Sequence, residues 1–261
     1  MQSKLFNCIS SLTLYSFTKI LPYNDSEHEY SEERRLTQTS LVPRLLAESI
    51  GAFTLVFVGV ASIIITGNLI AIALAHGLAI ALMASAFGHI SGGHFNPAVT
   101  IGFWVTQRIE SIPAVAYILA QLLGGIVGAI AINLLLPASL LEITSSLGTP
   151  ELDSQISFTA GVAIEAILTF FLVLVIFGTA VDSRGPALGG MAIGLAITMD
   201  ILAGGALTGA AMNPARALGP ALISGTWGNH LVYWVGPIIG GVGAALLYHT
   251  ILIKDGGKEQ T

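Results

Sequence analysis

The tripeptide Asn96-Pro97-Ala98 occurs a second time in this chain, as Asn213-Pro214-Ala215, 117 residues further on. The same interval relates other parts of the sequence, because it also places Glu48 on Glu165. Further pairs in this register are 77–80 with 194–197, Gly92 with Gly209, and Gly124 with Gly241. A long repeat made of apolar segments predicts a membrane protein built from two related halves.

The composition excludes a water-facing globular surface. Of the 261 residues, 54% are hydrophobic and 10% are charged, whereas a soluble domain has about 25% charged residues. The net charge is -5 and the Lys and Arg residues form no basic patch, so we expect a lipid bilayer and no nucleic acid as partner. A lone Cys8 and six scattered His residues indicate no metal site, and no cofactor is expected.

Six apolar stretches approach the length of about 20 residues that a bilayer-crossing helix needs. They are 45–66, 69–87, 112–135, 158–181, 188–202 with its flanks, and 231–253. We therefore predict an all-α membrane protein with six transmembrane helices. The expected domains are a disordered cytoplasmic tail at 1–40, a channel domain at 41–254 with repeat halves of about 41–136 and 158–254, and a short tail at 255–261.

Two shorter apolar pieces, 97–105 and 214–223, begin with the repeated tripeptide and are about half a span long. Pro suits the first turn of a helix, and Asn before it is a good N-cap. We predict two re-entrant half-helices, because irregular backbone survives at membrane depth where it is buried in protein or lines a water-filled cavity. The alternative is a pair of interfacial amphipathic helices, and the matched placement in both repeats argues against it.

The odd number of spans in each half predicts that the second copy enters the membrane upside down. Lys and Arg lie before the first span, between spans two and three, between four and five, and after six, while the other connections carry none apart from Arg216. Both termini are therefore predicted to be cytoplasmic. The half-helices then enter from opposite faces and meet tip to tip. We expect the plasma membrane, with an organelle membrane as the alternative.

The meeting point of the half-helices predicts the chemistry. Two N-terminal ends bring two positive dipole ends together, and Asn96 and Asn213 add amide donors. Such a constriction passes neutral molecules that accept hydrogen bonds and opposes protons and cations. Arg216, a cation at membrane depth, is expected to narrow the mouth and repel cations. The alternative is an Arg that extends back to the membrane surface.

Glu48 and Glu165 hold matching positions in the first and fourth spans. Two buried carboxylates can form a proton relay. We favour a bracing role, in which each accepts hydrogen bonds from the backbone N–H groups of a nearby loop. His94, two residues before Asn96, is interpreted as a loop brace rather than a ligand, and Asp200 is expected to do similar structural work.

The residues around both motifs resemble the aquaporins, of the major intrinsic protein family. The resemblance covers about residues 43–253 and depends on 91–99 (Ser-Gly-Gly-His-Phe-Asn-Pro-Ala-Val), 212–216 (Met-Asn-Pro-Ala-Arg) and the two-half layout. It implies a homotetramer with one pore in each subunit. It also implies a central constriction and a filter on the non-cytoplasmic side. The constriction residues are Asn96, Pro97, Ala98, Asn213, Pro214 and Ala215, and the filter residues are His76, Ile201, Ala210 and Arg216.

The implied filter is similar to that of the plant tonoplast branch and its ammonia-permeable animal relatives. Water is the expected permeant, and ammonia, hydrogen peroxide and urea are further candidates. Ala217 stands where glycerol facilitators typically carry Asp, which disfavours glycerol. Residues 137–157 lack the His that some tonoplast relatives carry there. Ala210 stands where many relatives carry the Cys that mercury attacks, so we expect the channel to be insensitive to mercury.

A passive channel for water and small neutral solutes is thus the predicted function. The alternative is an ion- or proton-coupled transporter, which also uses inverted repeats and broken helices. Coupling needs a titratable group in the pathway, and His76 is the strong candidate. An adhesive role finds no support in the short outer loops, and no nucleophile–base pair or metal set indicates an enzyme.

Overall fold

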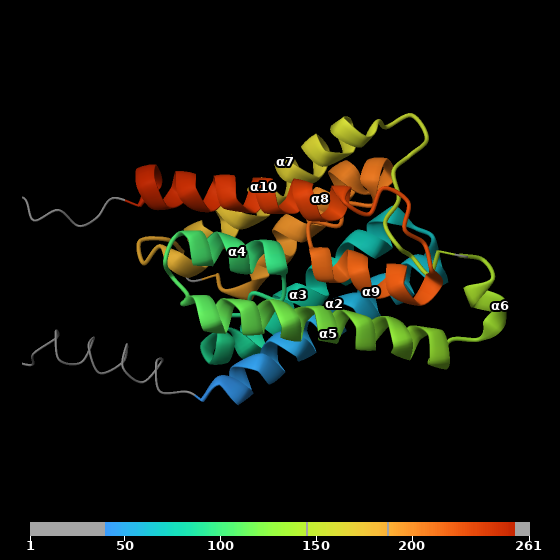
Figure 1. The fold of residues 1–261 in the computed structure, drawn as a ribbon, viewed down its shortest axis with the longest axis horizontal. Helices are drawn as coiled ribbons and strands as arrows, with labels where there is room; N and C mark the ends of the chain where they lie inside the picture. Colours follow the sequence, from blue (N-terminus) through green and yellow to red (C-terminus); the bar gives the residue numbers. More distant parts are fainter. Residues whose placement is uncertain (1–39, 145, 187, 254–261) are drawn as a thin grey trace, which may run out of the picture. The chain divides into compact units, whose positions relative to one another are not determined.

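The computed structural model describes residues 40–144, 146–186 and 188–253, and statements about structure concern these residues. Apart from Ser40, the tails predicted at 1–40 and 255–261 lie outside them. The described elements are α-helices and two π-helical turns, η1 and η2, with no strand among them (Figure 1). The prediction of an all-α protein is confirmed.

Six helices are long and apolar enough to cross a bilayer, which confirms the number of predicted spans. They are α2 (Leu41–Thr66), α3 (Leu69–Ser91), α5 (Ser111–Leu135), α7 (Phe158–Ile176) continued by η1 (Phe177–Val181), α8 (Gly190–Thr208), and α10 (Val232–Leu247) continued by η2 (Tyr248–Leu252). A short helix, α6 (Ala138–Leu141), follows α5. Large apolar side chains such as Leu78 and its repeat mate Leu195 are 51% and 59% exposed, as suits a surface that faces lipid.

The fifth span differs most from its prediction of 188–202. Gly204 and Gly205 follow the predicted end of this span, and glycine generally weakens helix interiors. Both glycines lie inside α8, which continues to Thr208. The helix ends at Gly209, whose φ of 82° lies in the left-handed region that glycine adopts easily.

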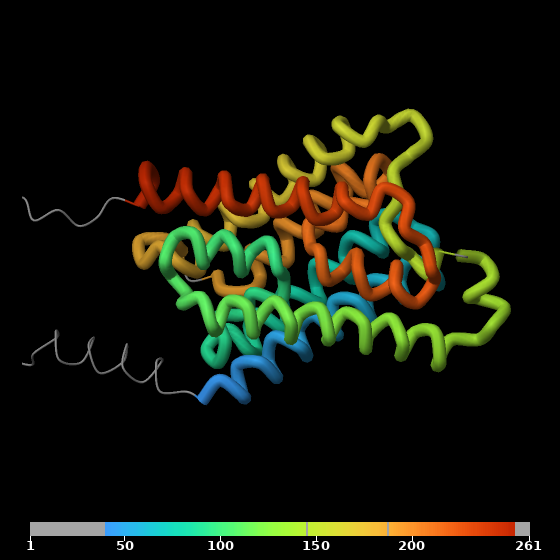
Figure 2. Tube along the Cα trace, in the orientation of Figure 1, coloured from blue at the N-terminus to red at the C-terminus, as the bar shows by residue number. Residues whose placement is uncertain are grey.

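Two half-helices, α4 (Pro97–Val105) and α9 (Pro214–Ser224), complete the fold. They enter the bundle from opposite ends, with their N-terminal ends at its centre (Figure 2). Each packs mainly on a helix of the other repeat, because α4 contacts α10 and α9 contacts α5. The two halves therefore form one interlocked unit, in which α2 also packs on α5, α7 on α10, and α3 on α8.

The repeat shifts by one residue in its third helix. A Cβ on Gly124 would lie 2.1 Å from the backbone carbonyl oxygen of Ser49, and a Cβ on Gly240 would lie 2.0 Å from the backbone carbonyl oxygen of Ala166. Ser49 and Ala166 are 117 residues apart, so the structural mate of Gly124 is Gly240. The predicted pairing of Gly124 with Gly241 is wrong, because the second repeat has one residue fewer before this helix. The absence of side chains lets the two backbones touch.

His230 lies in the turn between α9 and α10. The indole Nε1 of Trp234 donates to His230 Nε2 at 3.1 Å. The Trp227 ring packs edge-on against the His230 ring, with 5.0 Å between the centroids. An indole N–H can only donate, so the hydrogen of the neutral imidazole is on Nδ1, which is buried without a partner in the part of the chain described. Burial lowers the pKa of His230 below its ordinary value of 6.5.

Acidification should therefore destabilise this turn. Below pH 6.5 the unfolded chain takes up a proton at His230 that the folded chain resists, so stability falls as the pH falls. We expect the melting temperature of the purified protein to fall between pH 7 and pH 5, and to fall less in His230→Gln. Equal falls in the two proteins would exclude His230 as the cause.

Candidate functional site

The tips of the two half-helices are built alike. Asn96 and Asn213 have extended backbones, with φ of -153° and -146°, and Pro follows each at the first helical position. The Asn96 Oδ1 accepts a hydrogen bond from the Ala98 N–H at 2.8 Å. The Asn213 Oδ1 accepts one from the Ala215 N–H at 2.9 Å. Each side-chain oxygen is thus turned to its own helix, which leaves the amide nitrogen for other partners.

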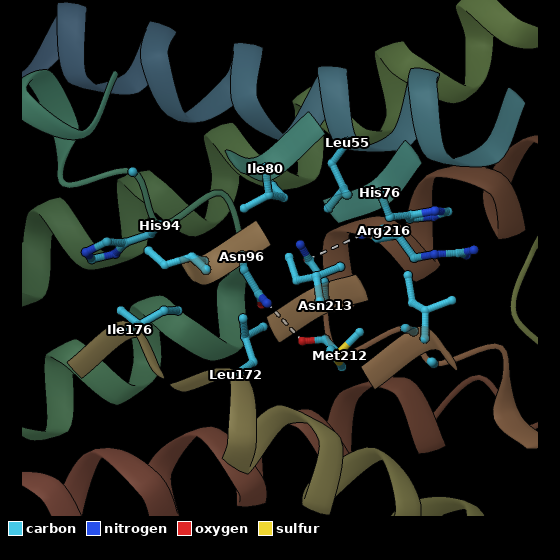
Figure 3. Close-up of a pocket in the computed structure, with 16 residues that line it drawn as sticks. Leu55, His76, Ile80, His94, Asn96, Leu172, Ile176, Met212, Asn213 and Arg216 are labelled. Carbon is cyan, nitrogen blue, oxygen red and sulfur yellow. Dashed lines mark hydrogen bonds between the residues drawn. The ribbon is translucent and has the colours of Figure 1, made fainter. Parts of the chain in front are cut away.

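The two tips are joined by reciprocal hydrogen bonds, one of which Figure 3 shows between Asn96 and Met212. The Asn96 Nδ2 donates to the Met212 carbonyl at 2.8 Å, and the Asn213 Nδ2 donates to the Phe95 carbonyl at 3.0 Å. An amide nitrogen carries two hydrogens, so each Asn keeps one for another acceptor. Both side chains line one cavity (Figure 3).

Phe95 and Met212, which precede the two motifs, have left-handed backbones with φ of 50° and 52°. This conformation is unfavourable for a residue with a side chain, by roughly 1–2 kcal/mol. It persists when the surroundings determine it. Here the Glu48 Oε2 accepts from the Phe95 N–H at 2.6 Å, and the Glu165 Oε2 accepts from the Met212 N–H at 2.7 Å.

Glu48 and Glu165 lie against the two loops, as the bracing hypothesis requires. Glu48 is fully buried and accepts four hydrogen bonds. The donors are Ser91 Oγ at 2.7 Å, His94 N at 2.9 Å, Phe95 N at 2.6 Å and Gln121 Nε2 at 2.7 Å. Glu165 accepts three, from Thr208 Oγ1 at 2.7 Å, Ala211 N at 2.9 Å and Met212 N at 2.7 Å. Only acceptors suit these positions, which disfavours a proton relay.

Two tyrosines that the sequence analysis missed hold the other side of each loop. The Tyr117 hydroxyl donates to the Ser91 carbonyl at 2.8 Å, and the Tyr233 hydroxyl donates to the Thr208 carbonyl at 2.9 Å. Ser91 and Thr208 are repeat mates at 117 residues, but the tyrosines are 116 apart. A search that allowed the repeat to slip by one residue would have found them.

His94 also braces its loop. The Thr100 hydroxyl donates its hydrogen to the Asn96 carbonyl at 3.1 Å, so it can only accept from the His94 Nδ1 at 3.1 Å. The His94 ring packs on Phe103 and Tyr117, with centroids 4.3 and 5.4 Å away. This arrangement agrees with the interpretation of His94 as a brace, although the residue also lines the cavity.

The four residues expected to form the filter, His76, Ile201, Ala210 and Arg216, line the same cavity as the two Asn side chains. Figure 3 shows His76 and Arg216 at one end of it, His94 at the other, and Asn96 and Asn213 between them. Most of the remaining lining is apolar, as Leu55, Ile80, Leu172, Ile176, Ile193 and Ile197 show. The sequence thus identified a set of residues that the fold brings together.

Arg216 and His76 present opposite hydrogen-bonding groups. Arg216 is 2% exposed, so it does not extend to the surface. Its Nη1 donates to the Gly148 carbonyl at 3.1 Å, a contact the sequence could not suggest because the acceptor is a backbone carbonyl. The His76 Nδ1 donates to the Ile72 carbonyl at 2.8 Å. The hydrogen of the neutral ring is therefore on Nδ1, and Nε2 keeps a free lone pair.

Asp200 differs from its expected bracing role. Its carboxylate is 1% exposed and has no hydrogen-bond partner within the described ranges. Ile201, the next residue, lines the cavity, and consecutive residues on an α-helix point about 100° apart. Ile201 and Asp200 therefore point in different directions, and the Asp200 carboxylate is buried without the loop contacts expected of it.

A cavity that passes between two joined helix tips, inside a bundle of six apolar helices, is the geometry of a membrane channel. Residues 35–248 match the family described as "Major intrinsic protein". The chain belongs to this family, and the resemblance to aquaporins seen in the sequence is confirmed.

Individual relatives agree with this assignment. The chain is 42% identical over 240 residues to "Aquaporin TIP4-4" of Zea mays, which covers 87% of this chain and 93% of the relative. It is 44% identical over 190 residues to "Aquaporin-4" of Bos taurus, covering 72% of this chain and 58% of the relative. The X-ray structure of the aquaglyceroporin from Plasmodium falciparum superposes with a TM-score of 0.73 at 27% identity, covering 82% of this chain and 98% of that one.

Proposed function

We propose that the protein is a passive channel for water, with ammonia, hydrogen peroxide and urea as further candidate permeants, and that it excludes protons and ions. The observation that carries this proposal is the cavity itself. It is lined by apolar side chains except at the Asn pair, His76, His94 and Arg216. Apolar walls bind a small polar solute weakly, so it is not retained, while the few polar groups orient it.

The Asn pair provides a barrier to protons. A water molecule at the tips accepts hydrogen bonds from the remaining hydrogens of Asn96 and Asn213. Its oxygen is then occupied by two donors, so its own hydrogens point away and it cannot take a further proton. The two helix N-termini add a positive potential at the same place, which opposes cations.

The filter, at one end of the cavity, selects among solutes. The Arg216 guanidinium can donate hydrogen bonds to a solute that carries a lone pair. Water, ammonia, hydrogen peroxide and urea all carry one. The Arg216 charge repels cations. Ile201 and Ala210 form the apolar part of the filter wall.

Osmotic shrinkage of proteoliposomes, followed by stopped-flow light scattering, tests the proposal. A channel should speed shrinkage several-fold over empty vesicles, with a weak temperature dependence and without an ion gradient or membrane potential. Ammonium and urea gradients in the same assay define the permeants. Flux that requires a gradient of protons or Na⁺ would instead favour the coupled transporter and overturn the proposal.

Mercury provides a test of Ala210 as a filter residue. The chain has one Cys, at position 8, and Ala210 lines the cavity. We expect wild-type water flux to resist mercuric chloride, and Cys8→Ser/Ala210→Cys to lose most of its flux on treatment and recover it with a thiol reductant. Cys8→Ser alone is the control. A mercury-insensitive Ala210→Cys protein would remove Ala210 from the filter.

The family resemblance supports the remaining parts of the proposal. The channel domain of residues 41–254 assembles as a homotetramer with one pore per subunit, spans the bilayer repeatedly, and transports rather than catalyses. Both termini are cytoplasmic. The plasma membrane is the location expected from the sequence, and the similarity to a TIP aquaporin favours the alternative, an organelle membrane. Cross-linking in native membranes tests the tetramer, and protease access to terminal tags in sealed vesicles tests the orientation.

A further inference from the structure

Gly59 on α2 faces the imidazole of His76 directly. A Cβ placed on Gly59 would lie 2.4 Å from His76 Nε2, 2.5 Å from Cδ2 and 2.7 Å from Cε1. These ring atoms are the three nearest contacts of that position, and all are far below an ordinary van der Waals distance. The His76 ring therefore occupies the space that a side chain at position 59 would fill.

The other repeat shows what happens without this recess. The residues 117 positions after Gly59 and His76 are Ile176 and Ile193. Both line the cavity, on the elements that correspond to α2 and α3. Two aliphatic side chains there share the space. In the first repeat one residue of the pair has no side chain and the other carries a large ring. The space that two isoleucines fill in the second repeat is therefore filled by His76 alone in the first.

The His76 ring lies between α2 and the cavity. Its Nδ1 is held by the Ile72 carbonyl one turn earlier on the same helix, at 2.8 Å. The residue is 3% exposed and lines the cavity. Protein interiors leave no spare volume around a buried ring. A methyl group at position 59 would therefore push the ring away from α2 and toward the cavity.

We propose that Gly59 is a specificity-determining residue, which sets the aperture of the filter by receiving the His76 ring. It acts through His76 and does not touch the solute, so it is a positioning residue. The inference rests on the proposed function, because an aperture matters only if solutes pass there. It names a position on α2 that lies outside the four filter residues.

Gly59→Ala tests this inference in the proteoliposome assay. We expect water permeability per inserted protein to fall at least tenfold, and urea permeability to fall by a larger factor, because a narrower opening excludes the larger solute first. Gly243→Ala is the matched control, since a Cβ there meets only Phe170 at 3.8 Å, an ordinary contact. Its permeability should equal that of wild type.

The double variant Gly59→Ala/His76→Ala separates a displaced ring from a damaged fold. Without the imidazole the added methyl loses its three nearest contacts, so the double variant should conduct like His76→Ala alone and should melt at the same temperature as that variant. This holds even if Gly59→Ala by itself assembles poorly. A double variant that stays closed or unfolded would mean that position 59 needs glycine for backbone packing, and would overturn the inference.

The proposed function and the inference about Gly59 fail on different results. If wild-type protein does not speed osmotic shrinkage, the proposed function fails. If wild type conducts and Gly59→Ala conducts water and urea at the wild-type ratio and rate, the channel stands and the role of Gly59 fails.

Discussion

Replacing Arg216 by valine should make the channel conduct protons and small cations while water still passes. The guanidinium is buried at the filter and its charge faces the cavity that a cation would enter. Two unit charges 4 Å apart repel by about 4 kcal/mol in a partly polar medium. Because about 1.4 kcal/mol changes a rate tenfold, we expect the proton conductance to rise at least tenfold even with the barrier at the Asn pair in place.

A pH-sensitive dye trapped in proteoliposomes, with a potassium potential as driving force, measures this leak. Arg216→Lys is the matched control, because lysine keeps the charge but not the planar set of donors that binds the Gly148 carbonyl. That variant should remain tight to protons while its solute rates change. Proton tightness equal to wild type in Arg216→Val would remove Arg216 from the cation barrier.

Glu48→Gln should destabilise the protein strongly, although it changes one atom type. Glu48 accepts four hydrogen bonds, two at each oxygen. A glutamine amide replaces one oxygen with a donor, so two buried donors lose their acceptor whichever way the amide turns. Each unsatisfied donor costs about 1–3 kcal/mol. A loss of roughly 2–6 kcal/mol is a large part of the 5–15 kcal/mol by which folded proteins are typically stable.

The melting temperature of detergent-purified protein is the measurement, and we expect a fall of roughly 5–20 °C. Glu142→Gln makes the same chemical change at an exposed position after α6 and should not alter melting. Unchanged melting in Glu48→Gln would mean that the loop before Asn96 does not depend on the carboxylate.

The repeat made much of this site predictable from sequence. The 117-residue interval paired the two Asn-Pro-Ala motifs and the two glutamates, and a carboxylate at membrane depth needs donors. A loop leading into a half-helix has backbone N–H groups to offer. That reasoning placed Glu48 and Glu165 against their loops without coordinates. The same reasoning failed for Asp200, because its direction depends on how α8 is rotated against its neighbours.

Other features needed the three-dimensional structure. The Gly148 carbonyl accepts its hydrogen bond from Arg216 in a loop with no repeat mate or periodic pattern. Every residue has a backbone carbonyl, so the sequence does not show which one is used. Gly59 looks like any glycine of a membrane helix until the ring of His76 is seen beside it. The slip from 117 to 116 residues is invisible where glycines are consecutive, as at Gly240 and Gly241, since either fits the alignment.

The reciprocal bonds between the two tips have a consequence for biosynthesis. A nascent chain that has delivered only its first 100 residues to the bilayer presents the Phe95 carbonyl and the Asn96 amide with nothing to bind, since their partners, Asn213 and Met212, are still to be translated. The first loop can therefore reach its final form only after the ribosome has added more than a hundred residues. Until then the unpaired polar groups of the first loop need water or other polar partners, because lipid offers none.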